Sequence, residues 1–183
     1  MRIIAGKFKS KRIEAVPGKS TRPILDRVKE SLFNILRFEI EDALVLDLFA
    51  GTGSVGLEAV SRGAGKVIMT ETNSLAYKIC QKNIKNCGAE KEVELRRTDA
   101  FSYLRNTSKS FDLIFVDPPQ FQNLWLEILQ LIAERPGLLQ AEGRLVVKIH
   151  PKEYEEFSSQ VLKEFRKDKY GNSMLLHFRL TNS

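Results

Sequence analysis

The sequence predicts an α/β fold with a mostly parallel, seven-stranded sheet, helices on both of its faces, and a small N-terminal hairpin-plus-helix extension. Three observations lead to this prediction. From residue 43 onward, short apolar runs alternate with segments of helical periodicity, which is typical of parallel strands joined by crossover helices. Basic residues gather before residue 30, ahead of that alternation. Gly171-Asn172 separates the last two strand-like segments and predicts a closing antiparallel hairpin.

Length and hydropathy limit the classes of protein to consider. A chain of 183 residues suits one domain with a short appendage. We assign residues 1–40 to a basic extension and residues 41–183 to the main domain. No apolar run approaches the roughly 18 residues of a transmembrane helix, and residues 1–7 lack the apolar stretch of a secretory signal. We therefore expect a cytoplasmic protein without a membrane partner.

The two cysteines predict neither a disulfide nor a metal site. Cys80 and Cys87 are seven residues apart, which on a helix separates them by about 10 Å, too far for a disulfide. They form no metal-ligand pattern with His150 and His177. We expect small buried side chains in a reducing compartment and no bound metal.

The positive charge is concentrated at the N-terminus. Residues 1–29 carry nine Lys or Arg and two acidic residues, a net charge of +7, whereas the whole chain has a net charge of +6. Such a cluster suits contact with a polyanion, since cations near a phosphate backbone gain affinity by releasing counterions. A solvated, disordered basic tail is the alternative. The candidate phosphate contacts are Lys7, Lys9, Lys11, Arg12 and Arg22.

The extension is predicted to begin with a hairpin over residues 2–16. Gly6 and Pro17-Gly18 mark turns, and the alternation of lysines over residues 7–11 places three ammonium groups on one face of an extended chain. A helix over residues 24–37 follows and packs the extension onto the main domain.

The helix at 24–37 has an apolar stripe, with Pro23 at its start and Thr21 as its cap. The later elements are predicted from apolar runs and helical periodicity. The strands are expected at residues 43–49, 66–71, 93–97, 111–116, 143–149, 161–168 and 173–180, and the helices at 54–62, 73–86, 122–134 and 152–157.

A glycine-rich loop, Gly51 to Gly56, directly follows a predicted strand and opens a predicted helix. Glycines there permit a tight turn and a close approach of the backbone to a ligand. Glu71, twenty residues after Gly51, is placed to accept hydrogen bonds from both hydroxyls of a ribose. The loop alone fits either a nicotinamide-dependent dehydrogenase or a methyltransferase that uses S-adenosyl-L-methionine.

Two further carboxylates favour S-adenosyl-L-methionine. Asp47 stands where a dehydrogenase strand is normally apolar, and it can hold the ammonium of a methionine moiety directly or through water. Asp99, just after the third strand, is placed for the adenine amino group. The candidate cofactor contacts are Asp47, Phe49, Gly51, Thr52, Gly53, Glu71, Asp99 and Ala100.

Asp117-Pro118-Pro119 closes the fourth predicted strand, at the edge of the sheet where such folds bind ligands. If the Asp117 carboxylate and the Pro118 carbonyl accept both hydrogens of an exocyclic amine, the nitrogen can aim its lone pair at a sulfonium methyl group. Asp117 can then take the departing proton or pass it to water. A merely rigid turn is the alternative. We predict methyl transfer to an amino group of a nucleic-acid base, with Asp117, Pro118 and Pro119 as the catalytic residues.

A family resemblance rests on five stretches that extend over most of the chain. They are Arg2-Ile3-Ile4-Ala5-Gly6-Lys7, Thr21-Arg22-Pro23, Asp26-Arg27-Val28-Lys29-Glu30-Ser31-Leu32-Phe33-Asn34, Asp47-Leu48-Phe49-Ala50-Gly51-Thr52-Gly53 and Val116-Asp117-Pro118-Pro119. These stretches resemble the bacterial 16S rRNA guanine-N2 methyltransferase family (RsmD type). The resemblance implies a Rossmann-like class I methyltransferase fold, and methylation of a guanine-966 type site of 16S rRNA in the small ribosomal subunit or its late assembly intermediate.

Gln120 departs from the family pattern, in which an aromatic residue follows the two prolines and stacks on the flipped base. Such stacking contributes roughly 1–3 kcal/mol per base. Either Phe121 replaces the missing ring after a small loop shift, or Gln120 hydrogen-bonds the base instead.

Three other functions remain open at this point. A DNA adenine-N6 or cytosine-N4 methyltransferase uses the same proline loop, but 183 residues leave little space for its target-recognition segment. A non-catalytic RNA-binding assembly factor is compatible with Gln120. A nicotinamide oxidoreductase does not account for Asp117-Pro118-Pro119.

Overall fold

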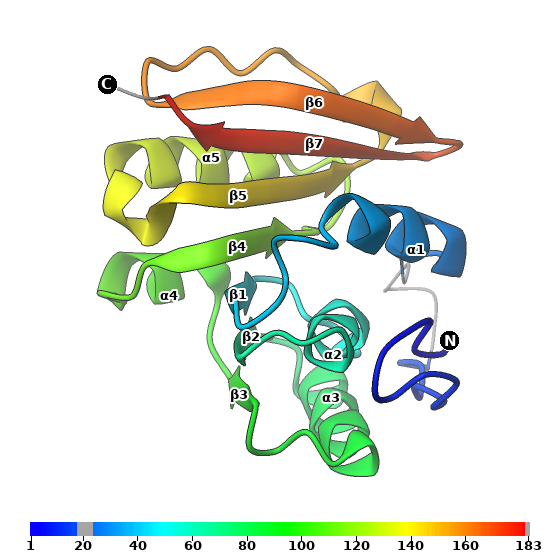
Figure 1. Cartoon of the computed structure of the whole chain (residues 1–183). Coiled ribbons are helices and arrows are strands. Elements are labelled where there is room, and N and C mark those ends of the chain that lie inside the picture. Colours follow the sequence, from blue (N-terminus) through cyan, green and yellow to red (C-terminus); the bar gives the residue numbers. More distant parts are fainter. Residues whose placement is uncertain (18–23, 182–183) are drawn as a thin grey trace.

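The computed structural model describes residues 1–17 and 24–181, and it confirms the predicted mostly parallel sheet. Within these residues, seven strands form one sheet in the order β3-β2-β1-β4-β5-β7-β6 (Figure 1). The pairings from β3 to β5 are parallel, and β7 runs antiparallel to both β5 and β6. The strands are Leu44–Asp47 (β1), Lys66–Thr70 (β2), Val93–Arg96 (β3), Phe111–Val116 (β4), Leu139–Ile149 (β5), Leu162–Tyr170 (β6) and Ser173–Leu180 (β7).

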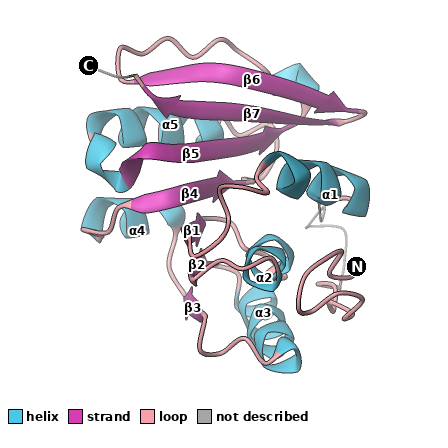
Figure 2. Cartoon of the chain, in the orientation of Figure 1, coloured by secondary structure: helices cyan, strands magenta, loops and turns pink. Residues whose placement is uncertain are grey.

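Helices cover both faces of this sheet, as Figure 2 shows by colour. The helices are Asp26–Ile35 (α1), Ser54–Ser61 (α2), Ser74–Cys87 (α3), Ala100–Asn106 (α4) and Leu124–Glu134 (α5), with 3-10 turns at Pro136–Leu138 and Pro151–Glu153. One core cluster joins α1, α2 and α3 to the sheet, and a second joins α4 and α5 to its opposite face. Cys80 and Cys87 are buried and unpaired, as predicted. No helix among the described residues is long and apolar enough to cross a membrane.

The structure differs from the predicted helices in two places. Helix α4 has no counterpart among the predictions, because its seven residues bury only Ala100 and Leu104 and leave no visible apolar stripe. The predicted helix at 152–157 is wrong. The chain makes a single 3-10 turn there, and the Glu153 carboxylate accepts a hydrogen bond from the His150 N–H at 3.0 Å instead of pointing along a continuing helix.

The N-terminal hairpin is also only partly realised. Arg2 and Arg12 form an isolated antiparallel bridge, but the chain between residues 5 and 10 folds into bends and turns. The predicted extended face of three lysines is therefore wrong. Its physical reason is the anchoring of this segment on α2: the Lys7 N–H donates to the Ser61 carbonyl at 2.8 Å, and the Phe8 N–H donates to Ser61 Oγ at 2.9 Å.

Helix α1 begins at Asp26 with Leu25 at its N-cap, later than the predicted start. The cap expected from Thr21 and the helix start expected at Pro23 lie outside the described residues. Val28, Leu32 and Phe33 are buried, so the predicted apolar stripe does pack the extension onto the main domain.

A buried carboxylate on α2, Glu58, holds the extension in place. Its oxygens accept hydrogen bonds from the N–H groups of Ile4 (2.8 Å) and Ala5 (3.1 Å) and from Arg62 Nε (2.8 Å). The ammonium of Lys29, on α1, lies 3.4 Å from the same carboxylate and donates to the Arg2 carbonyl at 2.8 Å. Both Glu58 and Lys29 are completely buried, and the Lys29 ammonium has Glu58 as its counter-ion, whereas Glu58 also pairs with Arg62.

We predict that Glu58→Gln lowers the free energy of unfolding by about 3–5 kcal/mol, because it leaves the Lys29 ammonium buried without a counter-ion. Chemical denaturation monitored by circular dichroism measures this change. Glu90→Gln, at an exposed position, is the control and should leave the midpoint unchanged. Equal midpoints for the two variants would show that the Glu58 contacts contribute little.

Candidate active site

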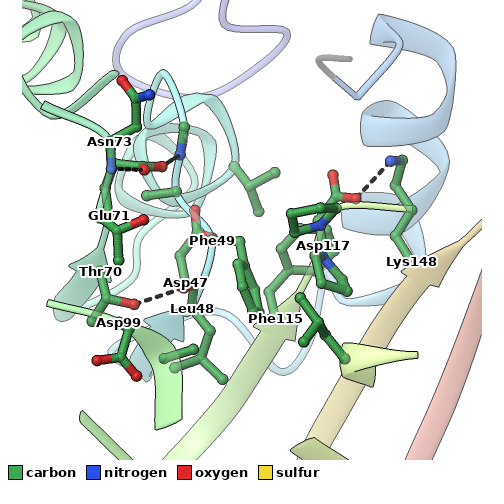
Figure 3. Close-up of a pocket in the computed structure, with 18 of the residues that line it drawn as sticks. Asp47, Leu48, Phe49, Thr70, Glu71, Asn73, Asp99, Phe115, Asp117 and Lys148 are labelled. Atoms are coloured by element: carbon green, nitrogen blue, oxygen red, sulfur yellow. Dashed lines mark hydrogen bonds and ion pairs between the residues drawn. The ribbon is translucent and has the colours of Figure 1, made fainter. Parts of the chain in front are cut away.

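A cavity of about 660 Å³ opens at the carboxyl edge of the parallel strands. The loops after β1, β2, β3 and β4 line it, together with Lys148 near the end of β5. Eleven residues singled out from the sequence meet there: Asp47, Phe49, Gly51, Thr52, Glu71, Asp99, Ala100, Asp117, Pro118, Pro119 and Gln120. Figure 3 shows Glu71 and Asp99 on one side of this space and Asp117 on the other.

The glycines of the loop have different roles. Gly51 adopts a φ of 54°, and a Cβ added to it would meet no atom within 4 Å, so it leaves open space beside the cavity. Gly53 adopts a φ of 79° and does not line the cavity. A Cβ on Gly53 would lie 2.7 Å from the sulfur of Cys80, so this glycine is required for packing against α3.

Glu71 fixes the glycine loop as well as lining the cavity. One carboxylate oxygen accepts a hydrogen bond from the Gly51 N–H at 2.9 Å, and the other accepts from the Asn73 N–H at 2.7 Å (Figure 3). A carboxylate oxygen accepts more than one hydrogen bond. The two backbone contacts therefore orient Glu71 while leaving capacity for ligand hydroxyls.

Asp99 caps helix α4 at the neighbouring wall. Its side chain accepts a hydrogen bond from the Ser102 N–H at 2.8 Å, and hydrogen bonds from Ser102 hold the pKa of Asp99 below its ordinary value. Ala100 follows in the first turn of α4 and is buried. The helix therefore fixes this wall, with the Asp99 carboxylate kept in its charged form.

Asp47 is the most unusual group of the site. It is only 1% exposed, and one oxygen accepts a hydrogen bond from the Gly56 N–H at 3.2 Å. Its other oxygen has no hydrogen-bond partner among the described residues. Burial, followed by the nearby negative charge of Asp117, raises the pKa of Asp47 to about 7. A buried carboxylate with an unsatisfied oxygen is suited to a cationic donor supplied by a ligand.

Asp117 is paired with a lysine that the sequence analysis did not single out. Lys148 Nζ lies 2.7 Å from Asp117 Oδ1, and the lysine side chain is only 5% exposed (Figure 3). Burial raises the pKa of Asp117, and the positive charge of Lys148 opposes this rise. The sequence does contain a signal for Lys148: it is the one charged residue in the apolar run Leu145 to Ile149, which indicates a lysine at a buried position.

The two residues after the prolines differ in their position relative to the cavity. Gln120 is half-buried and lines the cavity, whereas Phe121 does not line it and is 63% exposed. Phe121 has a left-handed backbone conformation with a φ of 59°. Its N–H donates to the Glu153 carboxylate, and its ring lies 5.2 Å from the ring of His150. Neither His150 nor Glu153 was identified from the sequence as part of the site.

The N-terminal cations lie away from the cavity lining. Lys7 pairs with Glu92, just before β3, at 2.6 Å, and Lys11 Nζ donates to the Cys87 carbonyl at 2.9 Å. These contacts place both lysines near the amino end of β3. Lys9 and Arg12 are exposed, and Arg22 lies outside the described residues.

The extension still reaches the cavity through two other contacts. Asn83 of α3 accepts a hydrogen bond from the Glu14 N–H and donates to the Thr52 carbonyl of the glycine loop, both at 2.9 Å. Ile24, just before α1, contributes to the cavity wall. Among the described residues, no group of three or more His, Cys, Asp or Glu is arranged to hold a metal ion.

The chain is similar to known proteins over most of its length. The family model described as conserved hypothetical protein 95 matches residues 1–179. YlbH of Bacillus subtilis, provisionally named an rRNA methyltransferase, is 37% identical over 85% of each chain. Ribosomal RNA small subunit methyltransferase D of Haemophilus influenzae is 36% identical over 75% of this chain and 73% of that protein. The solved structure of yhhF from Escherichia coli, provisionally named a methyltransferase, superposes with a TM-score of 0.85 and 29% identity, covering 98% of this chain and 97% of that one.

The raised pKa of Asp47 predicts a pH-dependent effect of Asp47→Asn on stability. Between the unfolded value, about 4, and the folded value of about 7, the folded protein retains a proton that the unfolded chain has lost. The contribution of Asp47 to the free energy of unfolding therefore falls as pH rises through this window. Relative to the wild type, Asp47→Asn should be more stable at pH 8 than at pH 4. Denaturant titrations at both pH values, with Glu127→Gln as an exposed control, measure this; a difference independent of pH would contradict it.

Proposed function

The chain belongs to the family described as conserved hypothetical protein 95, and from this premise we propose that it transfers a methyl group from S-adenosyl-L-methionine to the N2 amine of a guanine in 16S rRNA. The membership confirms the family resemblance of the sequence, and the 0.85 superposition confirms the methyltransferase fold. The observation that carries the proposal is the meeting of Asp47 and Asp117 in one cavity, one suited to a cationic ligand group and the other to an amine. The relatives named for rRNA favour RNA over DNA as the substrate.

The cavity residues fit S-adenosyl-L-methionine as the cofactor. The unsatisfied oxygen of Asp47 is the acceptor for its ammonium, and Glu71 is the acceptor for its ribose hydroxyls. Asp99 and Ala100, at the start of α4, are placed for the adenine. Gly51, without a side chain, leaves space for the close approach of the ligand. When bound, this cofactor supplies an electrophilic methyl group on a sulfonium.

Asp117 and Pro118 receive the acceptor amine in this proposal. Lys148 occupies one Asp117 oxygen at 2.7 Å and leaves the second oxygen as an acceptor for an amine hydrogen. The Pro118 carbonyl accepts the other hydrogen, so the nitrogen presents its lone pair toward the methyl group. Pro119 keeps the loop rigid and free of a competing N–H donor. Asp117 or a neighbouring water then takes the proton released on transfer.

RNA docking is assigned to the basic extension, residues 1–40, with residues 41–183 as the methyltransferase domain. Lys9 and Arg12 are exposed and have no carboxylate within 4.0 Å among the described residues, which suits them to phosphate contacts. Lys7 and Lys11 already have partners that a phosphate would have to replace. The proposed partner is the small ribosomal subunit or its late assembly intermediate, with a guanine-966 type site as the target.

The proposed reaction predicts incorporation of labelled methyl groups into guanine. The protein is incubated with labelled S-adenosyl-L-methionine and either free 16S rRNA or small subunits that lack the modification, and mass spectrometry locates the product. Asp117→Ala should lower the rate at least 100-fold, because the amine loses its acceptor. Glu127→Ala, on the exposed side of α5, is the control. Label in adenine or cytosine of duplex DNA, or in no base at all, overturns the proposal.

The assignment of the extension predicts a loss of salt-dependent RNA affinity. Lys9→Glu and Arg12→Glu should each weaken binding to 16S rRNA and reduce the salt slope by about one phosphate contact. Lys109→Glu tests an exposed lysine just before β4, outside the extension, and should behave like the wild type. Filter binding at several salt concentrations makes the comparison. Equal salt slopes for all three variants would remove the extension from the RNA interface.

A further inference from the structure

Within the part of the chain that the structure describes, Lys148 is the one lysine or arginine that lines the cavity. The same lining contains the carboxylates of Asp47, Glu71, Asp99 and Asp117. Lys148 pairs with a single one of them: its Nζ lies 2.7 Å from Asp117 Oδ1 and makes no other hydrogen bond to a described residue. The positive charge of the cavity wall therefore stands beside the carboxylate that the proposed reaction uses for the amine.

The register of the sheet places Lys148 beside Asp117. Strands β4 and β5 are parallel, with Val116 next to Val147, so the residues that follow are Asp117 on one strand and Lys148 on the other. Both valines belong to the core cluster of α4 and α5. Because successive side chains alternate between faces, Asp117 and Lys148 both point to the other face. Lys148 is also paired with Leu175 of β7, so its backbone is fixed from both sides.

Both members of the ion pair are largely removed from solvent. The Lys148 side chain is 5% exposed and that of Asp117 is 18% exposed. Burial raises the pKa of Asp117 and the negative charge of Glu153 acts in the same direction, whereas Lys148 opposes them through its charge and its hydrogen bond. Asp47 faces Asp117 as well, since the negative charge of Asp117 raises the pKa of Asp47. The charged form of Asp117 therefore depends on Lys148.

The charge and the orientation of Asp117 decide whether it can receive an amine. An ionised carboxylate only accepts hydrogen bonds, whereas a protonated one also donates. A protonated Asp117 would present an O–H to an amine that is itself a donor, and it could not take the proton released on transfer. By occupying Oδ1, Lys148 leaves the second oxygen for the amine hydrogen.

We propose that Lys148 is a positioning residue of the reaction, which holds the Asp117 carboxylate charged and turned so that one oxygen is reserved for the acceptor amine. Lys148 acts through Asp117 and needs no contact with the methyl group or the base. This inference rests on the proposed function, because it requires an amine as the methyl acceptor.

The pH dependence of methyl transfer to unmodified small subunits tests this role. Lys148→Met replaces the ammonium by an apolar chain of similar length, so the pKa of Asp117 should rise. The acidic limb of the kcat profile should then move to higher pH by about one to three units, the usual effect of a neighbouring positive charge on an aspartate. The rate lost at pH 6 should be largely regained at pH 9. A merely structural role would lower kcat equally at all pH values.

Two further variants separate charge from packing. Lys148→Arg keeps the positive charge and should leave the acidic limb close to that of the wild type. Lys82→Met is the matched control, because Lys82 Nζ also lies 2.7 Å from a carboxylate oxygen, that of Glu14, but Lys82 does not line the cavity. It should keep the wild-type profile.

A second readout uses the free protein. Carbon-13 NMR titration of the aspartate carboxyl groups, with the Asp117 signal assigned from Asp117→Asn, should show a higher pKa of Asp117 in Lys148→Met than in the wild type. Circular dichroism establishes that the variant is folded, and Lys148→Gln takes its place if it is not. An unmoved Asp117 titration or an unmoved acidic limb in the folded variant overturns the positioning role.

The positioning role and the proposed function fail differently. If the wild type labels guanine and Lys148→Met keeps its pH profile, the role of Lys148 is wrong and the proposed function stands. If the wild type labels no base, both are overturned.

Discussion

The buried carboxylate of Glu58 is the interaction on which the arrangement of the molecule depends. A fully buried carboxylate needs charged and hydrogen-bonding partners, and Glu58 draws them from three segments: the N–H groups of Ile4 and Ala5, the guanidinium of Arg62, and the ammonium of Lys29. Because Glu58 lies on the helix that the glycine loop opens, the extension and the cofactor loop are fixed to the same element. The extension and the glycine loop therefore share α2 as their common anchor.

Four carboxylates, those of Asp47, Glu71, Asp99 and Asp117, line the same cavity, so their negative charges need stabilising partners. Glu71 and Asp99 are stabilised by backbone N–H groups, and Asp117 has the Lys148 ammonium. One oxygen of Asp47 has no hydrogen-bond partner among the described residues, and burial together with the negative charge of Asp117 raises the pKa of Asp47 to about 7. A cationic ligand beside Asp47 would supply the missing partner.

Residues from another part of the chain hold the loop after β4 in place. Asp117 depends on Lys148, and Phe121 depends on His150 and Glu153, all of which belong to the end of β5 and the turn after it. The parallel pairing of β4 with β5 brings both loops to one edge of the sheet.

The sequence by itself determined the α/β class, from the alternation of strands and helices along the chain. It also identified the glycine loop, Asp47, Glu71 and Asp117-Pro118-Pro119, because each is a short pattern at the end of a predicted strand. Helix α4 was missed because its stripe contains only two buried residues, and the hairpin was mispredicted because contacts with Ser61 on α2 outweigh local alternation. Lys148, His150 and Glu153 lie about 30 residues from their partners in the chain. Only the tertiary structure decides such contacts, because the order of strands in the sheet, and not the spacing of residues, brings the two loops together.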